Sequence, residues 1–267
     1  LAGRPRAHER LRLPRDQAQS YCASRAKQGD QNFGHATVFV SWALVSTPRD
    51  LLNALEEYER KKGLDPATTF YWVCNFCIRQ LDGKEEDVPR LGEMVAACPR
   101  FVMLLEPWDE MATGRFGGNG NCLGRSWCLL ELYHAVKSGA ELDMALPRGE
   151  EARFLAALEE NARAAQDAFA HVDIIKAEAF DPKDKEWILQ MVREDVGVTE
   201  LNRQVIEALN KWAVRVAVAA AEERGIASGL ALCTAGYLRD LGNYEEARAL
   251  VERVVAAREA AEAAEEG

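Results

Sequence analysis

The chain has 267 residues, of which 48% are apolar, and its formal net charge is −10. This length accommodates one large domain, or one domain with an appendage, around a substantial core. The negative charge argues against a nucleic-acid-binding body, because phosphate binding requires a basic surface that releases counterions. No apolar run reaches the ~20 residues that a membrane span needs, so we expect neither nucleic acid nor membrane as a partner.

Residues 1–35 are predicted to form a basic N-terminal extension. Between residues 1 and 27, seven Lys and Arg side chains stand against two acidic ones, which leaves an excess of five positive charges. The extension lacks the apolar centre of a signal peptide. A solvated segment without chemistry of its own is the favoured interpretation.

Strand-like and helix-like blocks alternate from residue 36 onward. The run "ATVFVSWALV" (36–45) is apolar throughout, as expected of a strand that is covered on both faces. A helix is predicted at 47–63, because Thr47 suits the N-cap, Pro48 suits the first helical position and Gly63 suits the end.

The following elements complete the pattern of an α/β domain with a five-stranded parallel sheet, after which only helices follow. We predict strands at 68–78, 100–108, 140–147 and 171–180, helices at 87–98, 125–139 and 150–168, and a loop at 109–124. Residues 36–180 are therefore assigned to the α/β domain and residues 181–228 to a helical connector.

The last part of the chain, 229–267, is predicted to be a helical hairpin. Its run "ALCTAGYLRDLGNYEEARALVERVVAAREA" resembles a tetratricopeptide repeat (TPR) of the kinesin-light-chain type. A single repeat cannot bury its own apolar face, so this one either docks on the α/β domain or begins a longer array. The positions that carry the match are Ala235, Leu238, Gly242, Tyr244, Ala247, Val251 and Val254.

The seven cysteines are odd in number and mostly lie in apolar surroundings, which favours reduced thiols in the cytosol. Cys74 and Cys77 form a CxxC inside a strand-like run, where residues three apart face opposite sides and cannot share a metal. No HExxH motif or carboxylate cluster indicates another metal site. We expect buried core thiols, a cytoplasmic protein, and neither a metal nor a resident cofactor.

The helix "RSWCLLELYHAVKSG" (125–139) carries one acid in its first half, Glu131. At about 100° per residue its apolar positions form one stripe, and Glu131 falls just outside the edge of that stripe. A carboxylate there is expected to face the rim of the sheet near the carboxyl ends of the strands, where ligands bind in open α/β folds. The outer face is predicted to carry Leu130, Tyr133 and Lys137, with His134 exposed to solvent.

Within that helix, "SWCLLEL" (126–132) resembles the "WCLxEL" signature of Toll/interleukin-1 receptor (TIR) domains, particularly those of plant immune receptors. In that family the motif opens the helix after the third strand of a five-stranded, flavodoxin-like sheet, which is also its predicted position here. The whole arrangement is similar to proteins of microbial eukaryotes that join a TIR-like domain to kinesin-light-chain-like repeats.

The resemblance implies a signalling or stress-response protein that cleaves NAD at the nicotinamide–ribose bond. In enzymatic TIR domains the glutamate of this helix is catalytic, and it maps onto Glu131. Nicotinamide is attached as a cation and leaves neutral, so one carboxylate that stabilises the oxocarbenium-like centre is enough. Such enzymes often build the site between neighbouring domains, which implies a homo-oligomer. The residues expected to line the site are Ser41, Trp42, Asn75, Trp108, Arg125 and Trp127.

Two other functions stay open at this stage. The chain could be a non-catalytic adaptor, in which the TIR-like domain self-associates and the repeats hold a partner peptide. It could also bind a nucleotide without turnover. The loop "GRFGGNGNCLG" (114–124) offers backbone N–H groups to a phosphate, but its glycines do not fit GxGxxG, so a mobile loop is favoured.

Overall fold

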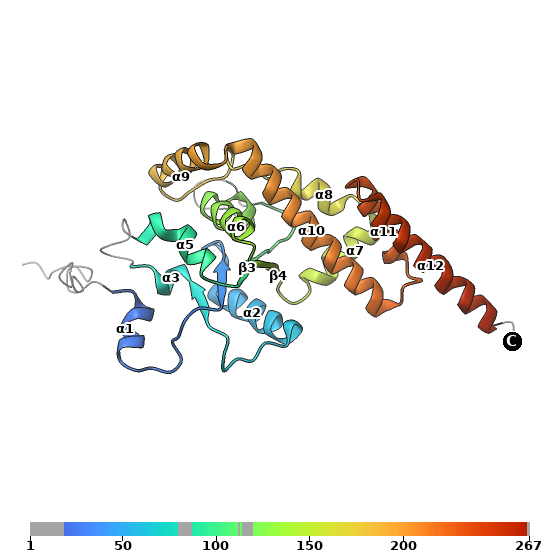
Figure 1. Ribbon diagram of the computed structural model, residues 1–267, viewed down its shortest axis with the longest axis horizontal. Helices are drawn as coiled ribbons and strands as arrows, with labels where there is room; N and C mark the ends of the chain where they lie inside the picture. Colours follow the sequence, from blue (N-terminus) through green and yellow to red (C-terminus); the bar gives the residue numbers. More distant parts are fainter. Residues whose placement is uncertain (1–18, 80–86, 112, 114–119, 266–267) are drawn as a thin grey trace, which may run out of the picture.

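The computed structural model describes residues 19–79, 87–111, 113 and 120–265. Strands and helices alternate as far as β4, and only helices follow (Figure 1). The elements are α1 (Tyr21–Lys27), β1 (Val38–Ser41), α2 (Pro48–Lys62), β2 (Tyr71–Val73), α3 (Cys74–Cys77), η3 (Val88–Arg90), α5 (Leu91–Ala96), β3 (Arg100–Leu104), η4 (Cys122–Gly124), α6 (Ser126–Ser138), β4 (Glu141–Ala145), α7 (Glu150–Glu160), α8 (Ala164–Phe169), α9 (Pro182–Asp195), α10 (Val198–Arg224), α11 (Gly229–Asp240) and α12 (Tyr244–Glu265).

The sheet has four parallel strands in the order β2-β1-β3-β4. The predicted α/β class with a parallel sheet is therefore confirmed. This order equals the first four positions of the flavodoxin-like order 2-1-3-4-5, in which the chain switches direction between β1 and β3. The last residue of β1, Ser41, is paired with Met103 of β3, so the carboxyl end of β1 lies at this switch point.

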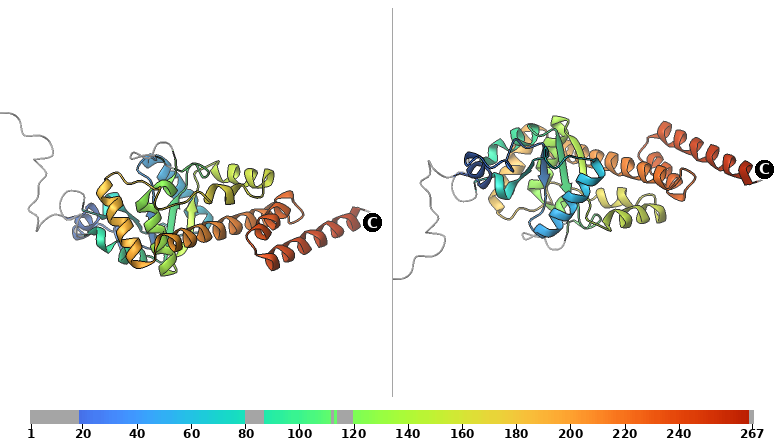
Figure 2. Two further views of the ribbon diagram at one scale, coloured as in Figure 1. Left: turned by 90° about the horizontal axis from the view of Figure 1, so that it is seen from above. Right: turned by 90° about the horizontal axis from the view of Figure 1, so that it is seen from below.

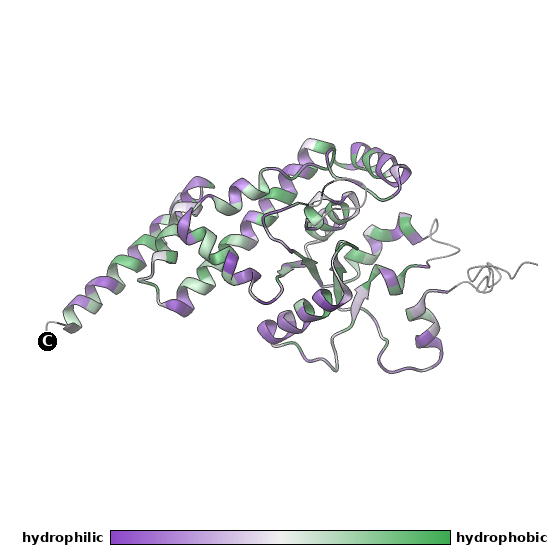
Figure 3. Cartoon of the chain, turned by 180° about the vertical axis from the view of Figure 1, so that it is seen from behind, coloured by the Kyte–Doolittle hydropathy of each residue, from purple (hydrophilic) through white to green (hydrophobic). Residues whose placement is uncertain are grey.

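Alternate residues of the central strands face two separate layers. Phe39, Phe101 and Met103 belong to the larger core, which lies against α6 and extends to α10. Val38 and Val40 face the other side, where they pack with the apolar stripe of α2. The hydropathy colouring of Figure 3 is strongly green over these strands, as expected of strands that are covered on both faces.

The local signals for α2 are all confirmed. Thr47 accepts a hydrogen bond from the backbone N–H of Asp50, the Asp50 side chain accepts from the Thr47 backbone, and Pro48 is the first helical residue. Gly63 ends the helix with φ 59°, in the left-handed region that glycine adopts without strain. These two caps determine the residues at which α2 begins and ends.

The prediction of a fifth strand at residues 171–180 is wrong. In this segment Glu178 forms only an isolated bridge with Arg125, at the start of α6. The outer edge of β4 is covered by α10, whose Arg215 donates a hydrogen bond of 2.7 Å to the carbonyl of Leu142. Because this helix occupies the place where a fifth strand would pair, the sheet ends at β4 within the described residues.

Other predicted elements also end earlier than expected, and the strands predicted at 36–45 and 100–108 stop at Ser41 and Leu104. The strand predicted at 68–78 stops at Val73, and Cys74–Cys77 form one turn of helix, closed by the hydrogen bond from Ile78 N–H to the carbonyl of Cys74. The helix predicted at 150–168 is broken, because Asn161 adopts an extended conformation with φ −142° and separates α7 from α8.

The segment predicted as a helical connector belongs to the same core as the sheet. α10 places a buried face, which includes Leu201, Val205 and Leu209, in the larger core. Trp212 anchors it further, because its Nε1 donates to the buried carboxylate of Asp143 in β4 at 2.9 Å. Residues 181–228 therefore act as a covering layer of the α/β body.

The C-terminal hairpin of α11 and α12 turns at Gly242, which has φ 84°. Ala235, Leu238, Ala247 and Leu250 form a small buried cluster between its two helices. α11 packs against α10 and α7, whereas the far end of α12 extends away from the body in both views of Figure 2.

The predicted basic extension is described only from residue 19 onward, and α1 forms within it. Its residues 1–18 lie outside the described residues. Among the helices that the structure describes, none is long and apolar enough to cross a membrane.

Candidate functional site

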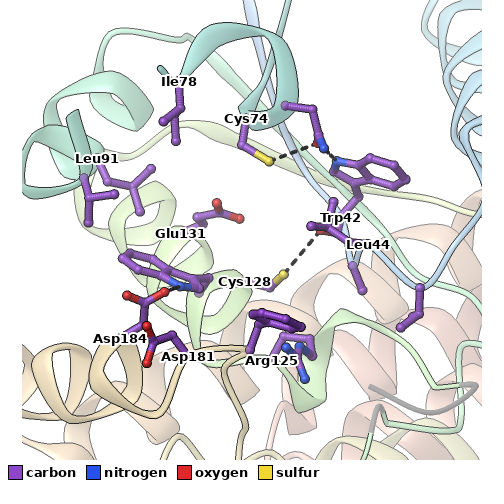
Figure 4. Close-up of a pocket in the computed structure, with 16 residues that line it drawn as sticks. Trp42, Leu44, Cys74, Ile78, Leu91, Arg125, Cys128, Glu131, Asp181 and Asp184 are labelled. Carbon is purple, nitrogen blue, oxygen red and sulfur yellow. Dashed lines mark hydrogen bonds between the residues drawn. The ribbon is translucent and has the colours of Figure 1, made fainter. Parts of the chain in front are cut away.

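A pocket of about 690 Å³ opens beside the carboxyl ends of β1 and β2. Its walls come from the segment after β1, from α3 and the residue that follows it, from η3 and the start of α5, from the first turns of α6 and from the start of α9 (Figure 4). The described lining residues are Trp42, Ala43, Leu44, Val45, Cys74, Asn75, Ile78, Val88, Leu91, Arg125, Trp127, Cys128, Glu131, Phe180, Asp181 and Asp184.

Glu131 lies in the second turn of α6 and is only 7% exposed. Its carboxylate points into the space between Cys74, Leu91 and Cys128 (Figure 4). The fully buried hydroxyl of Ser41 donates a 2.5 Å hydrogen bond to Oε2 of Glu131. The carboxylate is therefore held by the end of β1 and presented to the pocket, as a group that stabilises a developing charge needs to be.

Burial raises the pKa of Glu131 to about 8, and the hydrogen bond from Ser41 acts in the opposite direction. Removing water penalises the charged carboxylate, whereas a donor to it favours the charged form. Glu131 is therefore largely protonated at neutral pH and becomes an anion under mildly alkaline conditions. A cationic ligand in the pocket would lower this pKa.

Two thiols flank the carboxylate (Figure 4). Burial and the neighbouring Glu131 raise the pKa of Cys74 to about 12. A hydrogen bond with Cys122 and burial raise the pKa of Cys128 well above its usual value. Their raised pKa values keep both thiols protonated at neutral pH, so they serve as neutral wall groups.

The wall next to β1 is tied to α3 by a side-chain hydrogen bond. Trp42 follows directly after β1, and its Nε1 donates to Oδ1 of Asn75 at 3.1 Å. Asn75 Oδ1 also lies 3.3 Å from the thiol of Cys74. The indole face of Trp42 is thus fixed at the pocket, where it can pack against a flat ring.

The opposite wall comes from α6 and α9. Trp127 Nε1 donates to Asp184 Oδ2 at 3.2 Å, and its ring packs on Trp187 at 5.7 Å between centroids. Asp181 caps α9 through the backbone N–H of Lys183. The described lining thus holds three carboxyl groups, on Glu131, Asp181 and Asp184, and a single guanidinium, on Arg125.

The structure brings together six of the seven predicted site residues. Ser41 and Glu131 are hydrogen-bonded to each other, and the other four line the pocket: Trp42, Asn75, Arg125 and Trp127. Trp108 does not line it. It is 3% exposed and packs edge-on against Phe154 at 5.1 Å between centroids, so the structure places it in the larger core and not among the described lining residues.

The outer face of α6 also differs from the prediction. Leu130 and Tyr133 are 1% and 3% exposed, because α9 and α10 cover that face, and Tyr133 donates to Asp195 of α9 at 3.0 Å. His134 is half-buried rather than solvent-exposed, since its ring packs against Gly92 so closely that a Cβ there would lie 2.9 Å from it. Burial lowers the pKa of His134.

Asp181 and Asp184 are pocket residues that sequence reasoning missed. Both follow the segment that was predicted as a strand of the sheet, and α9 was therefore not expected near the start of α6. The only local signal was "DPKD", an Asp N-cap followed by Pro at the first helical position. Residues 114–119 of the glycine loop lie outside the described residues.

Within the described residues, no three His, Cys, Asp or Glu side chains are arranged to hold a metal ion. Comparisons with protein-family models, with curated proteins and with solved structures return no match to this chain.

Proposed function

We propose that this chain is a TIR-like enzyme that cleaves the nicotinamide–ribose bond of NAD or a related nucleotide, with Glu131 as the catalytic carboxylate. The observation that carries the proposal is the Ser41–Glu131 pair, a buried carboxylate held by one hydrogen bond and turned into a pocket beside the strand ends. The resemblance of "WCLLEL" to the TIR signature is the reason for proposing NAD cleavage as the reaction.

The reaction balances without a second acid. The bond between the ribose carbon and the pyridinium nitrogen breaks, its electron pair stays on nitrogen, and nicotinamide leaves neutral. Ionised Glu131 stabilises the positive charge that develops on the ribose. Water then adds to the ribose carbon and loses one proton, which gives ADP-ribose. Ordinary glycosides need a general acid for the leaving oxygen, and this leaving group does not.

The lining of the pocket suits a flat cation. Trp42 and Trp127 supply aromatic walls on opposite sides, and aromatic faces attract cations as well as pack against flat rings. Asp181 and Asp184 add negative charge near the start of α9. A pyridinium entering this site lowers the pKa of Glu131, so binding of substrate itself favours the ionised form.

Self-association in the cytoplasm is part of the proposal. Leu44 and Phe180 belong to the pocket lining and are 68% and 61% exposed, so the pocket presents two large apolar side chains to solvent. A second copy of the chain would cover these side chains and close the site against water.

One observation favours the alternative function of a non-catalytic adaptor. Val251 and Val255 lie one turn apart on α12 and are 39% and 47% exposed, so the TPR-like hairpin offers an apolar stripe to a partner helix or peptide. Nicotinamide release from NAD by the purified chain separates the two functions, because the adaptor releases none.

A further inference from the structure

Two cysteines that are 55 positions apart in the sequence meet beside the pocket. Cys22 lies in α1 and Cys77 is the last residue of α3, and their Sγ atoms are 3.5 Å apart. Both are free thiols and both are half-buried, so small reagents can reach them. Cys77 sits three residues after Cys74, on the helix that forms one wall of the pocket.

The contact between these sulfurs is set by the packing of α1 on α3. Tyr21 directly precedes Cys22, and Phe76 directly precedes Cys77; their rings lie 6.0 Å apart. Tyr21 also packs edge-on against Phe33 at 5.7 Å. Two successive residues of α1 thus face two successive residues of α3, which holds the thiols in register.

We propose that Cys22 and Cys77 form a reversible disulfide that ties α1 to α3. A disulfide has an S–S length of about 2.0 Å, so the sulfurs must approach by only about 1.5 Å from their present contact. Small rotations of two half-buried side chains supply that movement.

Glutathione disulfide is an oxidant that can drive the reaction. The Cys22 thiolate attacks one of its sulfurs, which releases one glutathione and leaves a mixed disulfide on Cys22. Cys77 then loses its proton and attacks the Cys22 sulfur, which expels the second glutathione. Burial raises the pKa of Cys77 to about 12, so this second step becomes faster as the pH rises. Two cysteine thiols are oxidised and one glutathione disulfide is reduced.

The bond would fix one wall of the pocket. α3 carries Asn75, which accepts the hydrogen bond from Trp42, so tethering α3 restrains the position of both side chains. An effect of oxidation on nicotinamide release rests on the proposed function. Formation of the disulfide is measured without any substrate. The disulfide proposal and the proposed function can therefore fail independently of each other.

The test is peptide mapping of the full chain after equilibration with a series of glutathione redox buffers. The expected product is a dithiothreitol-sensitive link between the peptides that contain Cys22 and Cys77. Cys74→Ser is the matched control, because it removes the other thiol of the same helix; it should keep the link, whereas Cys22→Ser and Cys77→Ser should each abolish it. Absence of the link in an excess of glutathione disulfide, or a link between Cys74 and Cys77 instead, overturns the proposal.

A second measurement does not depend on the mapping. A bond between Cys22 and Cys77 closes a loop that contains β1, α2 and β2, so oxidation should raise the Tm of the chain by roughly 5–10 °C. The same oxidation of Cys22→Ser should leave Tm unchanged. Equal shifts in both proteins would mean that another thiol is responsible, which also contradicts the proposal.

Discussion

The hydroxyl of Ser41, at the end of β1, donates a 2.5 Å hydrogen bond to the carboxylate of Glu131 on α6, although 90 positions separate the two residues in the sequence. This pair joins the central strand to the helix that covers it. It also moderates the pKa of Glu131, the buried acid of the described pocket lining, because the Ser41 hydroxyl opposes the larger effect of burial.

The first prediction concerns the pH dependence of nicotinamide release. In the proposed reaction the ionised form of Glu131 is the active form, and burial raises the pKa of Glu131 to about 8. We expect kcat/KM to rise about tenfold per pH unit below that value and to level off above it. Rates measured from pH 6 to pH 10 test this, and a rate that falls as the pH rises through 8 would contradict it.

The second prediction concerns Ser41→Ala. The Ser41 hydroxyl lowers the pKa of Glu131, so its removal should move the inflection of the same pH profile to a more alkaline value. The control is Ser138→Ala at the far end of α6, where the hydroxyl donates to the carbonyl of Ala135 at 3.1 Å; its profile should match that of the wild type. An unchanged inflection in Ser41→Ala would show that the hydrogen bond does not tune the carboxylate.

The third prediction is that Glu131→Gln stabilises the folded chain. Because the folded state raises the pKa of Glu131 from 4.5 to about 8, it binds a proton more tightly than the unfolded state does. The stability of the wild type is thus reduced as the pH rises from 4.5 towards 8 and stays reduced above it. Gln carries no charge and avoids this loss.

The gain from Glu131→Gln should therefore be small near pH 4.5 and reach up to about 4 kcal/mol in the free energy of unfolding at pH 9. Urea denaturation at both pH values measures it. The control Glu223→Gln replaces an exposed glutamate of α10. It should change the free energy of unfolding only slightly at both pH values. A destabilised Glu131→Gln at pH 9 would show that the carboxylate is not buried as described.

The fourth prediction concerns Asp143, which holds α10 on the sheet. Its carboxylate accepts from Trp212 Nε1 at 2.9 Å and lies 2.6 Å from Lys62 Nζ. Asp143→Ala leaves the buried N–H of Trp212 without its acceptor and leaves Lys62 with its ion pair to Glu141 at 3.1 Å, so we expect a loss of about 2–4 kcal/mol in the free energy of unfolding. In a double-mutant cycle with Trp212→Phe, the two losses should not add; additive losses would mean that the two residues are uncoupled.

The fifth prediction separates two tryptophans that the sequence placed in one site. Trp127→Leu should raise the KM for NAD, because Trp127 lines the pocket. Trp108→Leu should leave KM unchanged and lower Tm instead, because Trp108 is buried against Phe154. A raised KM for Trp108→Leu, measured at a temperature where the variant is fully folded, would show that Trp108 contributes to NAD binding.

The elements that local signals determine could be predicted from the sequence. The caps of α2 at Thr47 and Gly63 are contained in a few neighbouring residues, and the apolar run that contains β1 indicates a strand covered on both faces. The position of Glu131 at the edge of an apolar stripe also predicted that its carboxylate would face the strand ends. Ser41 was expected nearby as one of the site residues that the TIR resemblance implies.

The features that could not be predicted depend on contacts between distant segments. The run at 171–180 has the apolar character of a strand, but α10 takes the edge of β4 and excludes it. Asp181 and Asp184 follow this segment at the start of α9 and line the pocket. Likewise, Leu130 and Tyr133 are buried only because α9 and α10 return over α6, which no pattern within α6 indicates.

The most direct test of the central claim is nicotinamide release from NAD at pH 8.5 by the full chain at high concentration, for wild type, Glu131→Gln and Glu223→Gln. We expect wild type and Glu223→Gln to release nicotinamide at equal rates, and Glu131→Gln to be slower by at least about 100-fold. A rise in Tm with NAD but no product from any of the three would indicate binding without turnover. Equal release by wild type and by folded Glu131→Gln would contradict the catalytic role of Glu131.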